Sequence, residues 1–227
     1  DGRASISEMA SAAAGRGYRY WAVTDHGRDL HLKSLSIQDV HRQAEEVRRL
    51  NAAFGGRITI LHGVEANIGP EGGLDYPDEI LAGYDVVVAS VHHHLRGDRD
   101  AMTRRVLRAI EHPRVHIIGH PTGRRLPRRP PYELDLEAVC RAAAAHGVAL
   151  EINSNPERLD LKDDHILLAR DYGCLFAVDS DAHRPRELDL IRFGVFTAQR
   201  GWLVRERVIN TWPLPRLRRF LSKRNSP

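Results

Sequence analysis

The sequence predicts an α/β fold built on a parallel sheet that curls into a barrel. Short apolar runs alternate with segments of helical period along the chain, which is the order of elements in βαβ units. The apolar runs are hydrophobic throughout, as expected for strands that are covered on both faces. Polar side chains that can bind metals follow one run after another, at the end of the sheet where parallel α/β folds form their sites.

Six strands and five helices account for most of the pattern. The expected strands cover residues 20–24, 59–64, 85–90, 115–119, 148–152 and 175–178. The expected helices cover residues 6–15, 37–54, 101–111, 136–146 and 163–172. A closed barrel of alternating strands and helices takes more than six strands, and this chain opens on a helix. We therefore expect a first strand upstream of residue 1.

Composition and charge favour one domain over residues 1–227, cytoplasmic and without membrane attachment. Hydrophobic residues make up 42% and charged residues 28% of the chain, which is the balance of a globular protein. No apolar run approaches the roughly 18 residues of a membrane-spanning helix, and no signal peptide opens the chain. Cys140 and Cys174 lie in apolar contexts, which predicts reduced core thiols. The net charge of +4 permits a polyanionic partner without requiring one.

Carboxylates, imidazoles or both follow all six expected strands. In chain order these residues are Asp25, His26, Glu65, His92, His93, His94, His120, Glu151, Asn153, Asp181 and His183. The C-terminal ends of parallel strands converge on one rim, so we expect many of these side chains to meet. A mixture of imidazoles and carboxylates suits Mn²⁺, Zn²⁺ or Fe²⁺ better than Mg²⁺ or Ca²⁺. The sequence therefore predicts a divalent transition-metal site, with manganese as the first choice.

A metal site of this kind can hydrolyse a phosphate ester, the reaction that the family resemblance described next implies. Bound divalent cations can neutralise the charge of a phosphate and activate water as the nucleophile. A protein nucleophile is then unnecessary. The sequence contains no Gly-x-Ser-x-Gly motif and no Walker loop, and neither cysteine follows a strand.

Five short motifs carry a resemblance to a known family. They are Thr24-Asp-His26, Gly63-Val-Glu65, Ser90-Val-His92, Gly119-His-Pro121 and Ser180-Asp-Ala-His183, and they resemble successive motifs of the PHP (polymerase and histidinol phosphatase) superfamily. Six further segments resemble its family X DNA polymerase branch: His120-Pro-Thr-Gly-Arg124, Glu151-Ile-Asn-Ser-Asn-Pro156, Arg158-Leu-Asp-Leu161, Phe193-Gly-Val195, Arg200-Gly-Trp202 and Asn210-Thr-Trp-Pro-Leu214. The resemblance implies a distorted, TIM-like (β/α)7 barrel that holds two to three metal ions.

The same resemblance implies a set of metal ligands. The implied ligands are Asp1, His26, Glu65, His92, His120, Asp181 and His183. Glu65 would be a bridging ligand, with His92 and His120 completing one site, and Asp1, His26 and His183 would hold another. Asp181 and Glu65 would serve the remaining site together with two histidines of a His-x-His motif upstream of residue 1. The implied catalytic residues are Glu65, Asp181 and His183.

Four other histidines have weaker claims to the site. His94 shares strand parity with His92 and could line the site, whereas His93 should point away. His62 lies three residues before Glu65, so it faces the opposite side of its strand. His116 lies at the far end of its strand, where a structural role is expected.

A basic loop after His120 predicts the substrate class. Arg124, Arg125, Arg128 and Arg129 suit the phosphates of a nucleic-acid backbone, and Asn153 is a further candidate for substrate binding. Three functions remain open. The first is a 3′–5′ exonuclease domain that acts on single-stranded or recessed DNA ends, with polymerase domains upstream in the same chain. The second is a small-molecule phosphatase of the histidinol-phosphate type, and the third is a non-catalytic structural module of a polymerase.

Overall fold

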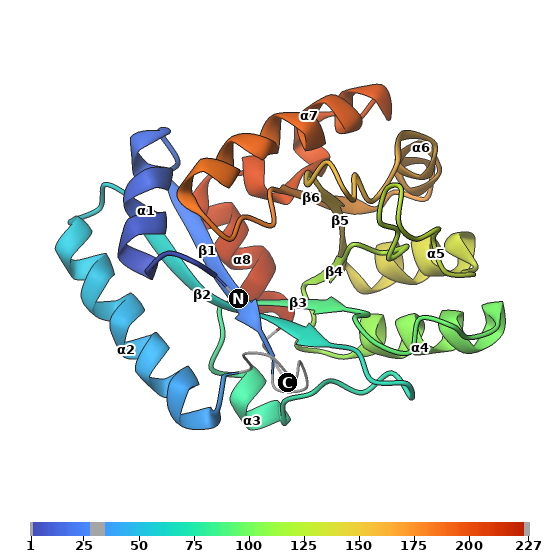
Figure 1. Cartoon of the computed structure of the whole chain (residues 1–227), viewed down its shortest axis with the longest axis horizontal. Helices are drawn as coiled ribbons and strands as arrows, with labels where there is room; N and C mark the ends of the chain where they lie inside the picture. Colours follow the sequence, from blue (N-terminus) through green and yellow to red (C-terminus); the bar gives the residue numbers. More distant parts are fainter. Residues whose placement is uncertain (1, 28–34, 225–227) are drawn as a thin grey trace.

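The computed structural model describes residues 2–27 and 35–224 (Figure 1). Six parallel strands form one sheet in the order β1-β2-β3-β4-β5-β6, so each strand pairs with its neighbours in sequence. The strands are β1 (Tyr20–His26), β2 (Thr59–Asn67), β3 (Val86–Ser90), β4 (Ile117–Gly119), β5 (Ala149–Asn153) and β6 (Leu175–Asp179). The sheet curls into a half-barrel, which confirms the predicted α/β barrel class.

Helices connect the strands along the outside of this sheet. The α-helices are α1 (Ile6–Gly15), α2 (Ile37–Phe54), α3 (Asp78–Leu81), α4 (Arg99–Glu111), α5 (Leu136–His146), α6 (Asp163–Asp171), α7 (Ile191–Arg200) and α8 (Leu214–Arg224). Three 3₁₀ segments join the last elements: η1 (Pro185–Leu190), η2 (Arg205–Arg207) and η3 (Ile209–Thr211). The sequence pattern did not predict α3 or α7. The short α3 offers no helical period, and Gly194 interrupts the pattern of α7.

Local chemistry explains where the predicted helices begin. Ser5 and Ser36 each accept a hydrogen bond from the backbone N–H of the third helical residue, and that residue's carboxylate accepts a bond from the serine N–H in return. Asp98 caps α4 through the N–H of Ala101, which places the helix start two residues before the predicted boundary.

The basic C-terminal helix covers the end of the half-barrel opposite the predicted site. Leu217 and Leu221 of α8 are buried against Leu61, Val86 and Ile117 at the N-terminal ends of three strands. The apolar face of this helix therefore contributes to the core.

Strands β1 and β6 are the two edges of the sheet, and no pairing joins them within the described residues. A cavity of about 1040 Å³ lies between them, and its lining runs from the rim residues His26 and Asp181 to Leu221 of α8. In the part of the chain that the structure describes, no helix is long and apolar enough to cross a membrane. Cys140 and Cys174 are both free thiols in the core.

Candidate metal centre

Three histidines surround Glu65 where the first four strands end. His26 on β1 is the register partner of Glu65 on β2, and His26 Nδ1 lies 3.2 Å from Glu65 Oε2. His92 follows β3 and His120 follows β4; their Nε2 atoms lie 3.2 Å and 3.0 Å from Glu65 Oε1. Ligand atoms of His26, Glu65 and His92 all lie within 4.8 Å of one another, close enough to share one ion.

The environment keeps Glu65 ionised. Burial opposes its charge, but the three imidazoles outweigh this effect and hold the pKa of Glu65 well below its usual range. Burial also disfavours the charged form of His26, yet hydrogen bonding and attraction to Glu65 raise the pKa of His26. For His92 burial dominates and lowers the pKa, which favours the neutral imidazole that a cation requires.

These residues fit a divalent transition metal. His92 Nδ1 and His120 Nδ1 are buried and have no hydrogen-bond partner among the described residues. Three convergent imidazoles around one ionised carboxylate form an N/O donor set of the kind that Mn²⁺, Zn²⁺ and Fe²⁺ accept. The convergence that the sequence predicted for His26, Glu65, His92 and His120 is therefore present in the fold.

Asp181 and His183 form a second group beside this cluster. Asp181 has a left-handed backbone (φ 49°), and its carboxylate accepts a hydrogen bond of 3.1 Å from Asn153 Nδ2. His183 Nδ1 lies 2.9 Å from the Asp181 carbonyl oxygen, and the His183 ring lies 6.5 Å from the His26 ring, centroid to centroid. His26 therefore stands between the Glu65 cluster and the loop after β6. Asp1 lies outside the described residues, and its role as a ligand stays a prediction.

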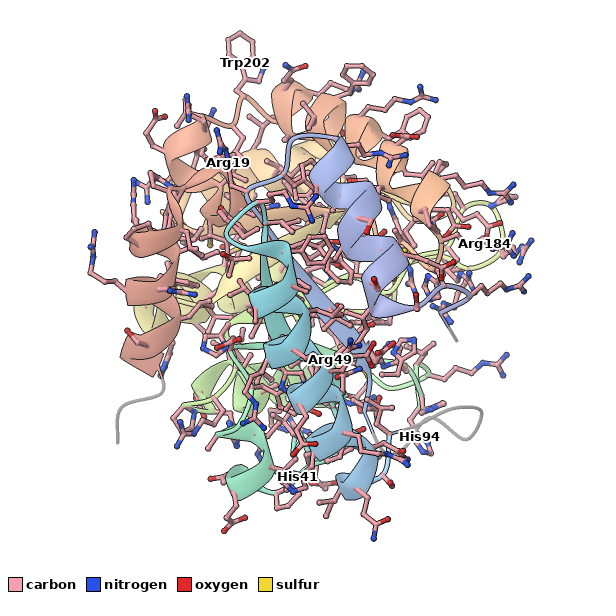
Figure 2. The ribbon with its side chains drawn as sticks, turned by 90° about the vertical axis from the view of Figure 1, so that its left-hand side faces the viewer. Arg19, His41, Arg49, His94, Arg184 and Trp202 are labelled. Carbon is pink, nitrogen blue, oxygen red and sulfur yellow. The ribbon has the colours of Figure 1, made fainter. Side chains whose placement is uncertain are left out.

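Residues next to the site lie on one side of the molecule, opposite a residue that precedes the first strand (Figure 2). In Figure 2, two labelled residues are on the right of the view: His94, which lies in the loop after β3, and Arg184, which follows the site residue His183. Arg19, which precedes β1, is on the left. The view agrees with the rule that the C-terminal ends of parallel strands form the functional face.

A buried pair of carboxyl groups lies beneath the rim. Burial and the neighbouring Asp179 raise the pKa of Glu151 well above its usual range, and burial raises the pKa of Asp179 to about 7. Burial and the mutual repulsion of the two carboxylates therefore favour a protonated form of the pair. Glu151 also accepts a hydrogen bond from the backbone N–H of His120, so it supports the loop that carries this imidazole.

The four arginines of the basic loop make their contacts within the loops themselves. Arg124 donates to the carbonyls of Arg158 and Leu159, and Arg129 donates to the carbonyl of Gly123. Arg125 and Arg128 lie 3.4 Å and 3.6 Å from the carboxylate of Glu157. In the described part of the chain, none of the four forms an ion pair or hydrogen bond with the rim residues. Their binding of a phosphate backbone stays a prediction.

The loop after β5 instead places Arg158 at the rim. Arg158 Nε lies 3.6 Å from Asp181 Oδ2, and the side chain is 14% exposed. One terminal nitrogen of its guanidinium is buried without a hydrogen-bond partner among the described residues. Strand-end reasoning missed Arg158 because this residue lies five positions beyond the end of β5. The signal that could have found it was the family resemblance of the segment 158–161.

The remaining histidines have structural contacts. His62 is buried, lies 3.1 Å from the Gln43 side chain and packs against the Tyr84 ring. His116 is buried between the N–H of Val87 and the carbonyl of Leu221. The carbonyls of His93 and His94 accept hydrogen bonds from buried Arg105, which holds the loop after β3.

A half-barrel of parallel strands with imidazoles and carboxylates at its C-terminal rim defines the chain as a metal-binding α/β barrel domain. A family model described as "PHP domain" matches residues 1–155. The chain belongs to the PHP domain family.

This chain is also similar to two curated relatives and to one solved structure. It is 40% identical over 224 residues to the DNA polymerase/3′-5′ exonuclease PolX of Bacillus subtilis (strain 168), a match that covers 98% of this chain and 39% of that protein. It is 31% identical over 222 residues to a probable phosphatase of Syntrophotalea carbinolica, a match that covers 91% and 85% of the two chains. The fold is similar to that of a histidinol phosphate phosphatase from Lactococcus lactis in complex with zinc, L-histidinol and phosphate. That comparison has a TM-score of 0.63 at 19% identity and covers 90% of each chain.

Proposed function

We propose that this chain is a divalent-metal-dependent phosphoesterase that removes nucleotides from the 3′ ends of DNA. The observation that carries the proposal is the cluster of His26, His92 and His120 around ionised Glu65 at the rim of the barrel. The 40% identity to a polymerase with a 3′-5′ exonuclease name supports DNA as the substrate. The chain spans 39% of that relative's length, so polymerase domains in the same protein are part of the proposal.

Different rim residues would bind the cations and the phosphate. His92 and His120 would hold one cation with Glu65; His26 and His183 would contribute to a second, and Asp181 would serve a third together with Glu65. Bound divalent cations supply charge neutralisation for the phosphate and lower the pKa of water. Arg158 has buried N–H groups beside Asp181, so it can orient an anionic phosphate oxygen at the rim.

His183 would act at the reaction centre as a ligand of a cation. Its ring nitrogen Nδ1 is engaged by the Asp181 carbonyl oxygen at 2.9 Å, which fixes the orientation of the imidazole. Its other nitrogen, Nε2, would then be the atom that binds the cation. Asn153 keeps the Asp181 carboxylate in place and so acts by positioning it.

A small-molecule phosphatase is the second candidate. The identity of 31% to a probable phosphatase, over 85% of that protein's length, favours it. The test compares release of nucleotides from a 3′-labelled single strand with release of phosphate from histidinol phosphate, both in manganese. Faster turnover of DNA ends supports the proposal, and faster turnover of histidinol phosphate replaces it with the second candidate. Failure to hydrolyse either substrate would support the non-catalytic structural module.

A further inference from the structure

The outer face of α7 carries apolar side chains where a surface helix normally has polar ones. Arg192, Val195, Phe196, Gln199 and Arg200 are all exposed and recur at spacings of three and four residues, so they share one face of the helix. Phe196 is 57% and Val195 is 41% exposed. The opposite face is buried through Gly194 and Ala198. Phe196 therefore lies between Arg192 and Arg200, because the three residues occupy positions i, i+4 and i+8 of the helix.

Trp202 continues this surface beyond the helix. Its side chain is 75% exposed, and Figure 2 shows it directed away from the ribbon into solvent. Its φ of 53° lies in the left-handed region that glycine normally occupies at the end of a helix. The N–H groups of Trp202 and Leu203 bond to the carbonyls of Gln199 and Ala198, which holds the backbone in this conformation. A bulky indole is thus kept in water on a fixed and unfavourable backbone.

Four of the six exposed large hydrophobic side chains in the described part of the chain lie between residues 195 and 204. They are Val195, Phe196, Trp202 and Val204. Together with Arg192, Arg200 and Arg205 they form a surface that we call the α7 surface. Apolar side chains this concentrated on one face mark an interaction site more often than scattered exposed residues do.

Charge identifies the class of partner. Residues 184–219 contain nine arginines and three carboxylates, a net charge of +6, whereas the rest of the chain sums to −2. Arg200 pairs with Asp163 of α6. Arg192 and Arg205 form no hydrogen bond or ion pair through their side chains among the described residues, and both are exposed. Three of these nine arginines lie on α8, so the positive charge that is available on the α7 surface comes from Arg192 and Arg205.

We infer that the α7 surface binds single-stranded nucleic acid, with bases stacked on Phe196 and Trp202 and phosphates near Arg192 and Arg205. Aromatic platforms combined with cationic side chains are how proteins bind single strands without reading their sequence. The inference rests on the proposed function, since it extends a DNA end at the metal centre into a bound strand. Helix α7 begins eight residues after His183 and spans about 15 Å, so a strand of several nucleotides would reach Trp202 from the rim.

The test is the affinity of the 227-residue chain for a fluorescein-labelled oligothymidylate in chelator, where hydrolysis is suppressed. Trp202→Ala and Phe196→Ala should each raise the Kd by about fivefold or more, the lower bound for one base stacked on an aromatic side chain. Trp202→Phe should retain most of the affinity because it keeps an aromatic face. Ile37→Ala is the matched control, since Ile37 is a 40% exposed apolar residue on α2 and should leave the Kd unchanged. Binding should also quench tryptophan fluorescence in the wild type and much less in Trp202→Ala.

An unchanged Kd in both alanine variants overturns the inference. So does a wild-type chain that self-associates through this face, detected as a dimer in sedimentation that Trp202→Ala dissociates. If the variants keep full affinity while the wild type degrades 3′ ends, the inference alone fails. If the strand binds through Trp202 but is not hydrolysed in manganese, the proposed exonuclease function fails and the α7 surface stands.

Discussion

His26 and Glu65 are register partners in the β1–β2 ladder, and His26 Nδ1 meets Glu65 Oε2 at 3.2 Å. The other oxygen, Glu65 Oε1, faces the Nε2 atoms of His92 and His120. The two oxygens of one carboxylate are thus directed toward different imidazoles. A carboxylate in this arrangement can serve two cations at once, and the bridging role that the family resemblance implies for Glu65 stays a prediction.

Glu65→Gln tests this arrangement with little change of shape. The variant removes the negative charge that the three imidazoles surround, so metal content after dialysis should fall by about tenfold or more, with a similar or larger loss of hydrolysis. Elemental analysis and a phosphodiester assay measure the two effects. Glu45→Gln is the control, because the Glu45 side chain is 75% exposed on α2. Normal metal content in Glu65→Gln would show that the cation lies elsewhere.

Two glycines provide a second, steric test of the site. A Cβ at Gly119 would lie 2.1 Å from Ser90 Oγ, 2.9 Å from Val88 and 3.5 Å from Glu65 Oε1. Gly119→Ala should therefore shift β3 or β4, lower the melting temperature and reduce metal binding. Gly15→Ala in α1 meets nothing within 4 Å and should be neutral or stabilising by up to about 1 kcal/mol. Thermal unfolding with and without manganese measures both variants, and equal melting temperatures would contradict the close approach of β4 to Ser90 at Gly119.

Variants of Arg158 can separate an effect on substrate binding from an effect on metal binding. Arg158→Ala should raise the KM for DNA ends by about tenfold, because the phosphate loses a charge-assisted hydrogen bond, while metal content stays normal. Arg158→Lys should recover only part of the loss, since an ammonium group cannot form the paired contacts of guanidinium. Arg170→Ala, a surface pair partner of Asp171, serves as control. A loss of metal without a change in KM would assign Arg158 to the support of Asp181 instead.

The strand-end residues could be predicted from sequence because one physical rule places them. His26, Glu65, His92 and His120 lie within one or two positions of strand ends, and parallel strands bring those ends together. Periodicity also located all six strands, although β1 extends two residues further to His26 because it pairs with β2 up to Glu65.

The loops were harder to predict because their conformation depends on contacts that no periodicity encodes. Asp160 is buried and accepts hydrogen bonds from the N–H and the hydroxyl of Thr122, and Arg124 donates to the carbonyls of Arg158 and Leu159. These bonds join the loops after β4 and β5, engage Arg124 internally and direct Arg158 to the rim. Charge alone suggested Arg124 as a phosphate ligand and gave Arg158 no role. Only the hydrogen bonds between the two loops show that Arg124 is engaged internally while Arg158 reaches the rim.

Arg125 and Arg128 remain candidates for contact with a DNA backbone. Their side chains are 41% and 67% exposed and share Glu157, so a phosphate can compete for them. Replacing both with alanine should reduce the slope of log affinity against log salt by roughly 0.7 to 0.9 for each phosphate that the protein no longer neutralises. Hydrolysis of a small chromogenic phosphodiester should be nearly unchanged. Arg129 is left intact because it holds the Gly123 carbonyl, and an unaltered salt slope would make this loop an ordinary surface.

The Glu151–Asp179 pair predicts the pH dependence of the metal-free protein. Burial and Asp179 raise the pKa of Glu151, and burial raises the pKa of Asp179 to about 7, so the folded state retains protons that the unfolded chain releases near pH 4. The stability that these protons maintain is complete below about pH 4 and is lost as the pH rises toward 7 and above. In chelator, the melting temperature of the wild type should therefore fall between about pH 5 and about pH 8.

Glu151→Gln should reduce this fall, because the amide reproduces the protonated carboxyl at every pH. Its oxygen can accept the hydrogen bond from the His120 N–H, and its NH₂ group can donate to Asp179. The variant should be more stable than the wild type at about pH 8 and similar at about pH 5, as measured by thermal unfolding in chelator. Glu79→Gln, an exposed residue of α3, should follow the wild type at both values. A parallel decline of wild type and Glu151→Gln would show that the two carboxyl groups do not retain a proton in the folded state.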